Sequence, residues 1–352
     1  MATILQRGRP LPYRRRPESR RAGCVAAGPR FGAGHNSLTG SRAVIRGAVT
    51  KTTEGQPVLT SATGRPASAA APAWSTLEVA QVRGKSRLIV CKNVQPLKIF
   101  NPASPTGACH AVLSSYGGGM VAGDIIRLRI SGQAGTRLFI NTQASTKIFR
   151  SIDGAVAEQH TAGTLGAGAL AVVFPDPVVL QAESRYRQMQ EWNIEPDSLL
   201  LVVDWFHSGR MDQGERFAFT ELHSELRVRV AGRLVLLDRF AFCPGEHIAT
   251  SPANFAGHQA FFSVFLVGNP TDARFQHLGA MLERQKMPGS TGPHFTISCL
   301  DCVISVARAR ENVYVLRAAA HGRMALQLLC DALLGTLAEE ELLGYNPLKR
   351  KY

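Results

Sequence analysis

Hydrophobic and polar residues alternate along much of the chain, and this pattern is typical of β-strands. Residues 74–93 (WSTLEVAQVRGKSRLIVCKN) alternate as the two arms of a hairpin would. Residues 127–130 and 137–140 flank a glycine-containing turn and predict a second pair of strands joined as a hairpin. Further strands are predicted over residues 169–174, 199–204, 226–230 and 234–242.

Helical spacing of apolar residues occurs only late in the sequence. Residues 271–287 show it, and so do the leucine-rich residues 324–343, which are followed by Gly344. The pattern therefore predicts a mainly β body with a few α-helices toward the C-terminus.

The positive charge of the chain is concentrated near its beginning. The 352 residues carry a formal net charge of +14, and residues 1–73 contain 12 of the 40 Lys and Arg residues but only 2 of the 26 acidic ones. This segment has few large apolar residues, so we expect a disordered basic extension. Three interpretations stay open: an organelle transit peptide, a dispensable extension or wrong start codon, and a basic arm that binds nucleic acid.

The rest of the chain is nearly balanced, with 28 basic and 24 acidic residues, which does not indicate a nucleic-acid-binding face. Seven scattered cysteines do not form a disulfide scaffold and favour a reducing compartment. No apolar run reaches the roughly 18 residues that span a bilayer. We expect a cytoplasmic protein, or one of the mitochondrion or chloroplast if residues 1–73 are a transit peptide.

The glycine-rich stretch at residues 115–124 (SYGGGMVAGD) raises the question of phosphate binding. Gly117, Gly119 and Ala122 fit the loose G-x-G-x-x-A dinucleotide pattern. That pattern needs a helix after it, whereas the residues that follow Asp124 alternate as a strand. We therefore predict a backbone corner between strands. A phosphate- or nucleotide-binding enzyme that uses this loop, from Gly117 to Asp124, remains the alternative function.

Six blocks of sequence, in this order and spacing, resemble the urease accessory protein UreD, called UreH in some organisms. They are SYGGGMVAGD, INTQASTKIFRS (residues 140–151), PDPV (175–178), ESRYRQ (183–188), LVVDWFHSGRMDQGERF (201–217) and LLDRF (236–240). The similarity covers a UreD-like domain at residues 74–352, and its opening stretch resembles the eukaryotic members.

The resemblance implies a helix-like stack of β-sheets and no catalytic activity. It implies a heteromeric complex with apo-urease, UreF and the GTPase UreG, with a dimeric form as one alternative. Such a protein holds no tight cofactor. It helps to deliver nickel, the transported ion, and a water-filled tunnel through the protein is the proposed route.

A nickel conduit needs ligands that release the ion. Thiolate and imidazole clusters hold Ni²⁺ tightly, whereas oxygen ligands and retained water exchange quickly. The family's blocks contain carboxylates at or near the ends of predicted strands, together with hydroxyls. These candidates are Asp124, Asp176, Asp204, Glu215 and Asp238, with Thr142, Ser145 and Thr146.

Each acid has a structural alternative, as a turn cap or one half of an ion pair. Asp204 is the most suggestive, because it follows five apolar residues and must find a partner or water. Basic residues are available for pairing, and a pair between Asp204 and Arg210 could lock a corner. The residues for which both a tunnel-lining and a structural role stay open include Lys147, Arg150, Glu183 and Arg210.

Cysteine and histidine residues give weaker signals. Cys299 and Cys302 form a CxxC near His294, but the alternating pattern around them indicates strand residues packed in a core. Cys109 and His110 are read in the same way. No nucleophile, base and acid can be grouped from spacing alone.

Overall fold

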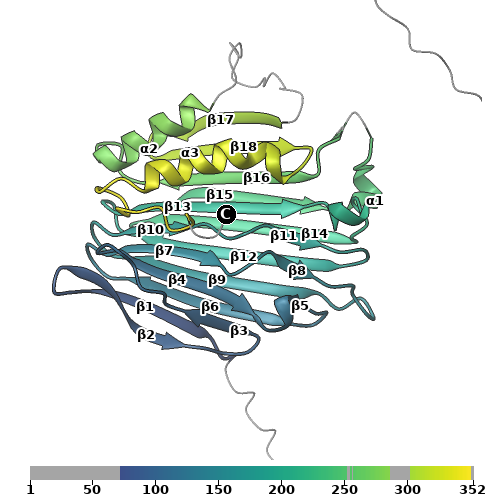
Figure 1. Ribbon diagram of the computed structural model, residues 1–352, viewed down its shortest axis with the longest axis horizontal. Helices are drawn as coiled ribbons and strands as arrows, with labels where there is room; N and C mark the ends of the chain where they lie inside the picture. Colours follow the sequence, from purple (N-terminus) through teal and green to yellow (C-terminus); the bar gives the residue numbers. More distant parts are fainter. Residues whose placement is uncertain (1–71, 252–253, 256, 286–301, 350–352) are drawn as a thin grey trace, which may run out of the picture. The chain divides into compact units, whose positions relative to one another are not determined.

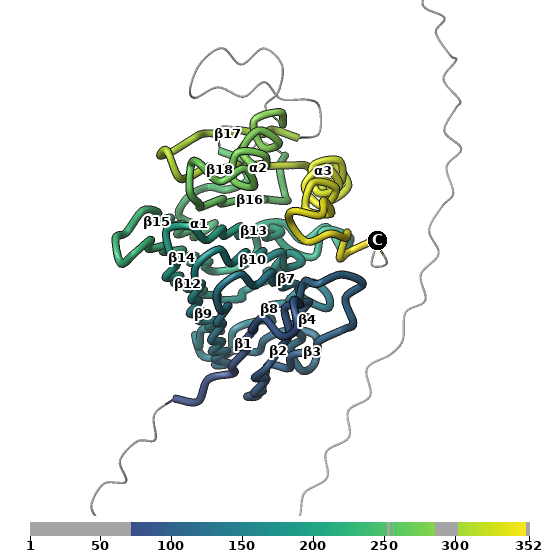
Figure 2. Tube along the Cα trace, turned by 90° about the vertical axis from the view of Figure 1, so that its left-hand side faces the viewer, coloured from purple at the N-terminus to yellow at the C-terminus, as the bar shows by residue number. Residues whose placement is uncertain are grey.

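A computed structural model describes residues 72–251, 254–255, 257–285 and 302–349. These residues form two β-sheets that face each other, with helices near the C-terminal end of the chain (Figures 1 and 2). The mainly β architecture of stacked strands is as the sequence predicts.

The first sheet has seven strands in the order β15-β14-β12-β9-β6-β1-β2. Its inner pairs are parallel, and the pairs β1–β2 and β14–β15 are antiparallel. In chain order the strands are β1 (Ser75–Val82), β2 (Lys85–Lys92), β6 (Ile125–Gly132), β9 (Ala157–Leu165), β12 (Arg185–Ile194), β14 (Glu221–Val230) and β15 (Arg233–Phe242).

The second sheet has eleven strands and the main order β17-β18-β16-β13-β10-β7-β4-β3. These strands are β3 (Leu97–Phe100), β4 (Cys109–Ser115), β7 (Arg137–Thr142), β10 (Leu170–Val173), β13 (Leu199–His207), β16 (Ala260–Val267), β17 (Cys302–Arg310) and β18 (Val313–Ala320). Three short strands extend it beside β13, namely β5 (Gly119–Met120), β8 (Thr146–Ile148) and β11 (Val178–Leu180).

Helices are short in the described part of the chain, and none is long and apolar enough to cross a membrane. The α-helices are α1 (Pro244–His247), α2 (Ala273–Arg284) and α3 (Gln327–Leu337), and the 3₁₀ turns are η1 (Tyr116–Gly118), η2 (Met211–Gln213) and η3 (Arg323–Leu326). Both predicted helices exist, but the second ends at Leu337 rather than near residue 343. The apolar spacing continues past it because Leu342 and Leu343 are buried in the turn that follows.

The predicted hairpin around residues 127–140 is wrong in its pairing, although both strands form. β6 belongs to the first sheet and β7 to the second, and each pairs in parallel with strands of later coils. The short loop between them turns the chain from one sheet to the other. It stacks on the next such loop, with the Gly135 amide donating to the Ala167 carbonyl at 2.8 Å. The chain thus coils between the sheets like a β-solenoid.

The two sheets differ in what covers them, and their sequences differ accordingly. The first sheet buries one face, so β12 alternates, with Tyr186 and Trp192 inward and Arg187 outward. The second sheet packs against the first sheet on one face and against α2 and α3 on the other. Strand β13 therefore begins with a continuous apolar run, Leu199–Val203.

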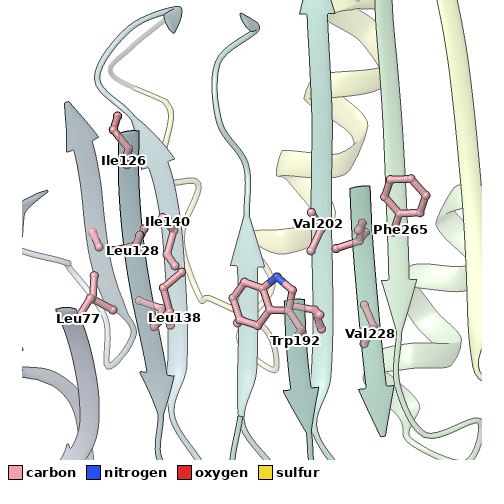
Figure 3. Close-up of a cluster of buried hydrophobic side chains, with 14 of the residues drawn as sticks. Leu77, Ile126, Leu128, Leu138, Ile140, Trp192, Val202, Val228 and Phe265 are labelled. Atoms are coloured by element: carbon pink, nitrogen blue, oxygen red, sulfur yellow. The ribbon is translucent and has the colours of Figure 1, made fainter. Parts of the chain in front are cut away.

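Buried apolar side chains from both sheets pack together in the core between them, including Leu128, Ile140, Trp192 and Val202 (Figure 3). Trp192 lies beside Gly163 on the neighbouring strand β9. A Cβ atom at Gly163 would lie 2.1 Å from the Trp192 ring, so this position requires glycine.

Candidate functional site

Three adjoining cavities lie between the two sheets. The first, about 300 Å³, is bordered by β12, β13, β14, β15 and β18, and the second, about 50 Å³, by β7, β9, β12 and β13. They share the lining residues Val178, Tyr186, Gln188 and Asp204. The third, about 370 Å³, adjoins the second through Thr142, Thr146 and Gln159 and reaches Gly118 in the glycine-rich turn. We call these the cavity row.

Asp204 lies where the first two cavities meet. It is on the face of β13 that points to the first sheet, and Gln188 of β12 and Ser224 of β14 reach it from that sheet. Gln188 Nε2 donates to Asp204 Oδ1 at 2.8 Å, and Ser224 Oγ donates to Oδ2 at 2.7 Å. Neither partner carries a charge that would balance the carboxylate.

Burial raises the pKa of Asp204 above its ordinary value. The hydrogen bonds from Ser224 and Gln188 oppose this rise, Asp238 adds to it, and Arg317 weakly opposes it. The same burial, with the nearby Asp204 charge, raises the pKa of Tyr186. Asp204 keeps some accessible surface because it faces the cavities, although it lies deep between the sheets.

An ion pair joins the two sheets at the end of the first cavity. Arg317 of β18 donates to Asp238 of β15, and both residues line the cavity. The Asp238 side chain is 19% exposed and that of Arg317 is 51% exposed, so the pair borders solvent.

Asp176 and Thr142 form a second polar group in the middle cavity. Thr142 Oγ1 donates to Asp176 Oδ2 at 2.8 Å and accepts the Asp176 amide at 2.7 Å. Asp176 is buried, and it lies in the loop between β10 and β11.

The cavity row thus brings together three predicted acids and three predicted hydroxyl residues. Asp204 and Asp238 line the first cavity, Asp176 the second, Thr142 and Thr146 the second and third, and Ser145 the third.

The other two predicted acids line none of the three cavities. Asp124 caps its own turn, where its Oδ2 accepts the Val121 amide at 2.9 Å. Glu215 accepts from Arg210 through Nε at 3.0 Å and Nη2 at 3.1 Å, and from the Ala182 amide at 2.8 Å. The Arg210 hydrogen bond chiefly lowers the pKa of Glu215.

The remaining predicted residues also lie outside the cavity lining. Arg150 and Glu183 form an exposed ion pair at 2.6 Å, and Lys147 is exposed on β8. Arg210 pairs with Glu215, so the corner lock suggested between Arg210 and Asp204 is wrong.

The glycine-rich stretch is a corner between strands, as the sequence predicts. Gly117 and Gly118 both have φ of +71° and Gly123 has φ of +86°, a region that glycine enters without strain. The stretch leads through β5 into β6, so no α-helix N-terminus follows it to face a phosphate.

Sequence reasoning missed the uncharged half of the site. Gln188, Ser224 and Gln159 all line cavities from inward positions of otherwise apolar-inward strands. Reading each strand for a polar residue at an inward position could have found them. Arg317 gave the same signal, since it interrupts the apolar strand β18, but its pairing with Asp238 could not be predicted because it joins segments distant in sequence.

The described residues include two of the three cysteines for which core packing was predicted. Cys109 and Cys302 are buried, as expected for core residues, and burial raises the pKa of Cys109 to about 11. His110 is also buried, and its Nε2 lies 2.8 Å from Asn141 Oδ1. Cys299 and His294 lie outside the described residues.

Most polar side chains that line the cavity row carry oxygen, and Arg317 and Trp205 are the exceptions. Carboxylates, hydroxyls and side-chain amides contribute to the lining, and no cysteine or histidine is among the described lining residues. Such a lining can contact a small hydrated cation weakly, but it offers no tight site for a transition metal.

Comparison with known proteins agrees with the pattern of sequence blocks. The family model described as UreD urease accessory protein matches residues 72–351. A urease accessory protein UreD of Cytophaga hutchinsonii is 35% identical over 280 residues, which cover 78% of this chain and 96% of that protein.

Plant relatives match over a shorter range. Urease accessory protein D of Oryza sativa subsp. indica is 38% identical over 156 residues, or 43% of this chain and 51% of the relative. That of Arabidopsis thaliana is 39% identical over 145 residues, or 40% and 49%. The family model spans all of the described residues and the bacterial match covers nearly all of its relative, so the chain belongs to the UreD family of urease accessory proteins.

Proposed function

We propose that the chain is a non-catalytic factor of urease maturation that conducts nickel ions along the cavity row. In this proposal it acts as a scaffold that binds apo-urease together with UreF and UreG. The observation that carries the proposal is that Asp176, Asp204 and Asp238 all line the cavities between two sheets whose facing sides are mainly apolar.

The chemistry of the lining suits passage better than storage. A hydrated Ni²⁺ ion loses much of its hydration energy between apolar sheets, and carboxylates placed along the way offset that loss. Because Gln188 and Ser224, the hydrogen-bond partners of Asp204, are uncharged, Asp204 can contact a passing cation without first breaking an ion pair with either of them.

The Asp238–Arg317 pair suits the end of such a route. It is partly solvated, so a divalent cation competes with Arg317 for the carboxylate at modest cost. Conduction then needs no nucleophile and no closed metal site.

The test compares Asp204→Asn with Asp197→Asn in urease activation. Asp197 is an exposed carboxylate in the turn before β13 and lines none of the three cavities. Each full-length variant is co-expressed with apo-urease, UreF and UreG, and urease activity is measured against added nickel, together with recovery of the complex. We expect Asp204→Asn to lower activation while leaving the complex intact, and Asp197→Asn to change neither.

Two results would contradict the proposal. Normal activation by Asp204→Asn over the whole nickel range would show that the charge has no part in conduction. Loss of the complex together with activity would assign Asp204 a structural role.

A further inference from the structure

The outer face of the first sheet holds a group of side chains of the types that ligate metals, and this group is separate from the cavity row. Glu221 and His223 of β14 and Cys243, next after β15, each place one donor atom within 4.8 Å of the donor atoms of the other two. All three residues are half-buried.

The strand pairing explains why these residues meet. Residues two apart on a strand share a face, so Glu221 and His223 lie side by side on β14. Leu222, between them, points inward and pairs with Phe242 of β15, and both are buried. The next residue, Cys243, therefore returns to the outer face beside Glu221, and Pro244 then begins α1.

The geometry points to a site for a divalent transition metal, Zn²⁺ or Ni²⁺, formed by Glu221, His223 and Cys243. The site combines a thiolate, an imidazole and a carboxylate, a donor set that binds both ions far better than oxygen ligands alone. Three protein donors leave coordination positions open to water, which is typical of sites that exchange a ligand rather than structural ones.

Glu221 can serve this site although it already has a basic neighbour. Its Oε1 lies 3.4 Å from Arg185 Nη1, whereas its Oε2 lies 3.6 Å from His223 Nε2. One carboxylate oxygen thus faces the arginine and the other faces the cluster. Binding forms a metal–thiolate bond and releases the Cys243 proton to solvent.

The inferred site stands apart from the proposed conduction of nickel. Its donors lie on the outward side of β14, whereas the cavity lining uses the inward Leu222 and Ser224 of the same strand. The site contains sulfur and nitrogen donors, whereas the described lining of the cavity row offers oxygen and amide groups.

The test titrates the metal-free full-length chain with Zn²⁺ alone and Ni²⁺ alone, against a competing chelator. Co²⁺ serves as a third probe, because thiolate ligation produces a charge-transfer band. We expect one equivalent bound with a thiolate band. Cys243→Ala should abolish the band, and His223→Ala should weaken affinity by about tenfold to a hundredfold or more, as loss of a ligand does at least as much as loss of its supporting partner.

Two control variants test whether a histidine or a cysteine outside the site binds the metal. His160→Ala removes the histidine of a similar His–Glu pair on β9 of the same sheet, where Nε2 lies 2.9 Å from Glu158 Oε2. Cys91→Ala removes an exposed cysteine of β2. Both should bind like the wild type, and circular dichroism should show that every variant is folded.

The inference fails if no thiolate band forms, or if the band survives Cys243→Ala. It also fails if the band is lost in Cys302→Ala while Cys243→Ala keeps it, since the ligand would then be the CxxC segment. Equal affinity of His223→Ala and the wild type would remove the imidazole from the site.

Discussion

Asp204 occupies an inward position of β13 where the strand otherwise presents apolar side chains. Its two hydrogen bonds come from neutral groups, and burial raises its pKa. The folded protein therefore bears a cost for holding the ionised carboxylate. A residue that costs stability in this way fits a functional role better than a structural one.

Replacing Asp204 with Asn should increase the free energy of unfolding at neutral and higher pH. A carboxyl whose pKa is raised by folding favours the folded state only while protonated, so wild-type stability falls as pH rises through that pKa. Asn carries no charge, and its advantage should disappear in acid. Urea unfolding across pH measures this, and parallel pH profiles for the two proteins would contradict it.

His207 predicts pH dependence of the opposite sign. Burial lowers its pKa from 6.5 to about 4. Between pH 4 and pH 6.5, His207 is therefore protonated in the unfolded chain and neutral in the folded chain. Stability should therefore fall as pH is lowered from 6.5 toward 4, by about 3 kcal/mol for this group.

His207→Gln should flatten that part of the pH profile of unfolding. His160→Gln, which removes a more exposed histidine of β9, serves as the control and should leave the slope in place. An unchanged slope in His207→Gln would show that other groups cause the acid sensitivity.

At the scale of the elements, close contact between the neighbouring strands β9 and β12 restricts which residues fit. Gly163 lies against the fully buried Trp192, whose ring cannot move away without disturbing the core. Gly163→Ala should lower the free energy of unfolding by about 1–3 kcal/mol, the usual cost of overpacking.

For a second glycine, Gly335, we expect the free energy of unfolding to change in the opposite direction. Gly335 is exposed in α3, and a Cβ atom there would meet nothing within 4 Å. Gly335→Ala should raise the free energy of unfolding by up to about 1 kcal/mol through helix propensity. Denaturant unfolding of both variants tests the pair, and similar effects would show that the Trp192 contact does not matter.

At the scale of the whole molecule, the segment before residue 72 adds most of the positive charge but lies outside the matched family region. Removing residues 1–71 keeps Trp74, whose ring lies 5.2 Å from the Arg129 guanidinium. We expect the shortened chain to unfold at the same urea concentration as the full chain and to activate urease equally. A lower unfolding midpoint or reduced activation would show that the segment contributes to the folded domain or its complex.

The arrangement of the whole molecule explains which features could be predicted from the sequence. Strands and helices were predictable where one face is buried, because periodicity records burial directly, as in β14 and α2. The pairing of β6 and β7 was not, since a four-residue loop with glycine suits a hairpin as well as a turn between sheets. Among the candidate acids, the sequence offered both Asp204 and Asp124 for the lining of a tunnel, yet one faces a cavity and the other caps a turn.

The sequence by itself determined the strand-rich architecture, the family, and the residue types available for contact with a metal ion. These follow from local periodicity and from ordered motifs, which are properties of neighbouring residues. Only the tertiary structure decided which acids share a cavity, that Arg317 rather than Arg210 pairs beside Asp204, and that Cys243 returns to Glu221 and His223. Those relations depend on strand register and on the coiling of the chain between two sheets, which bring together residues far apart in the sequence.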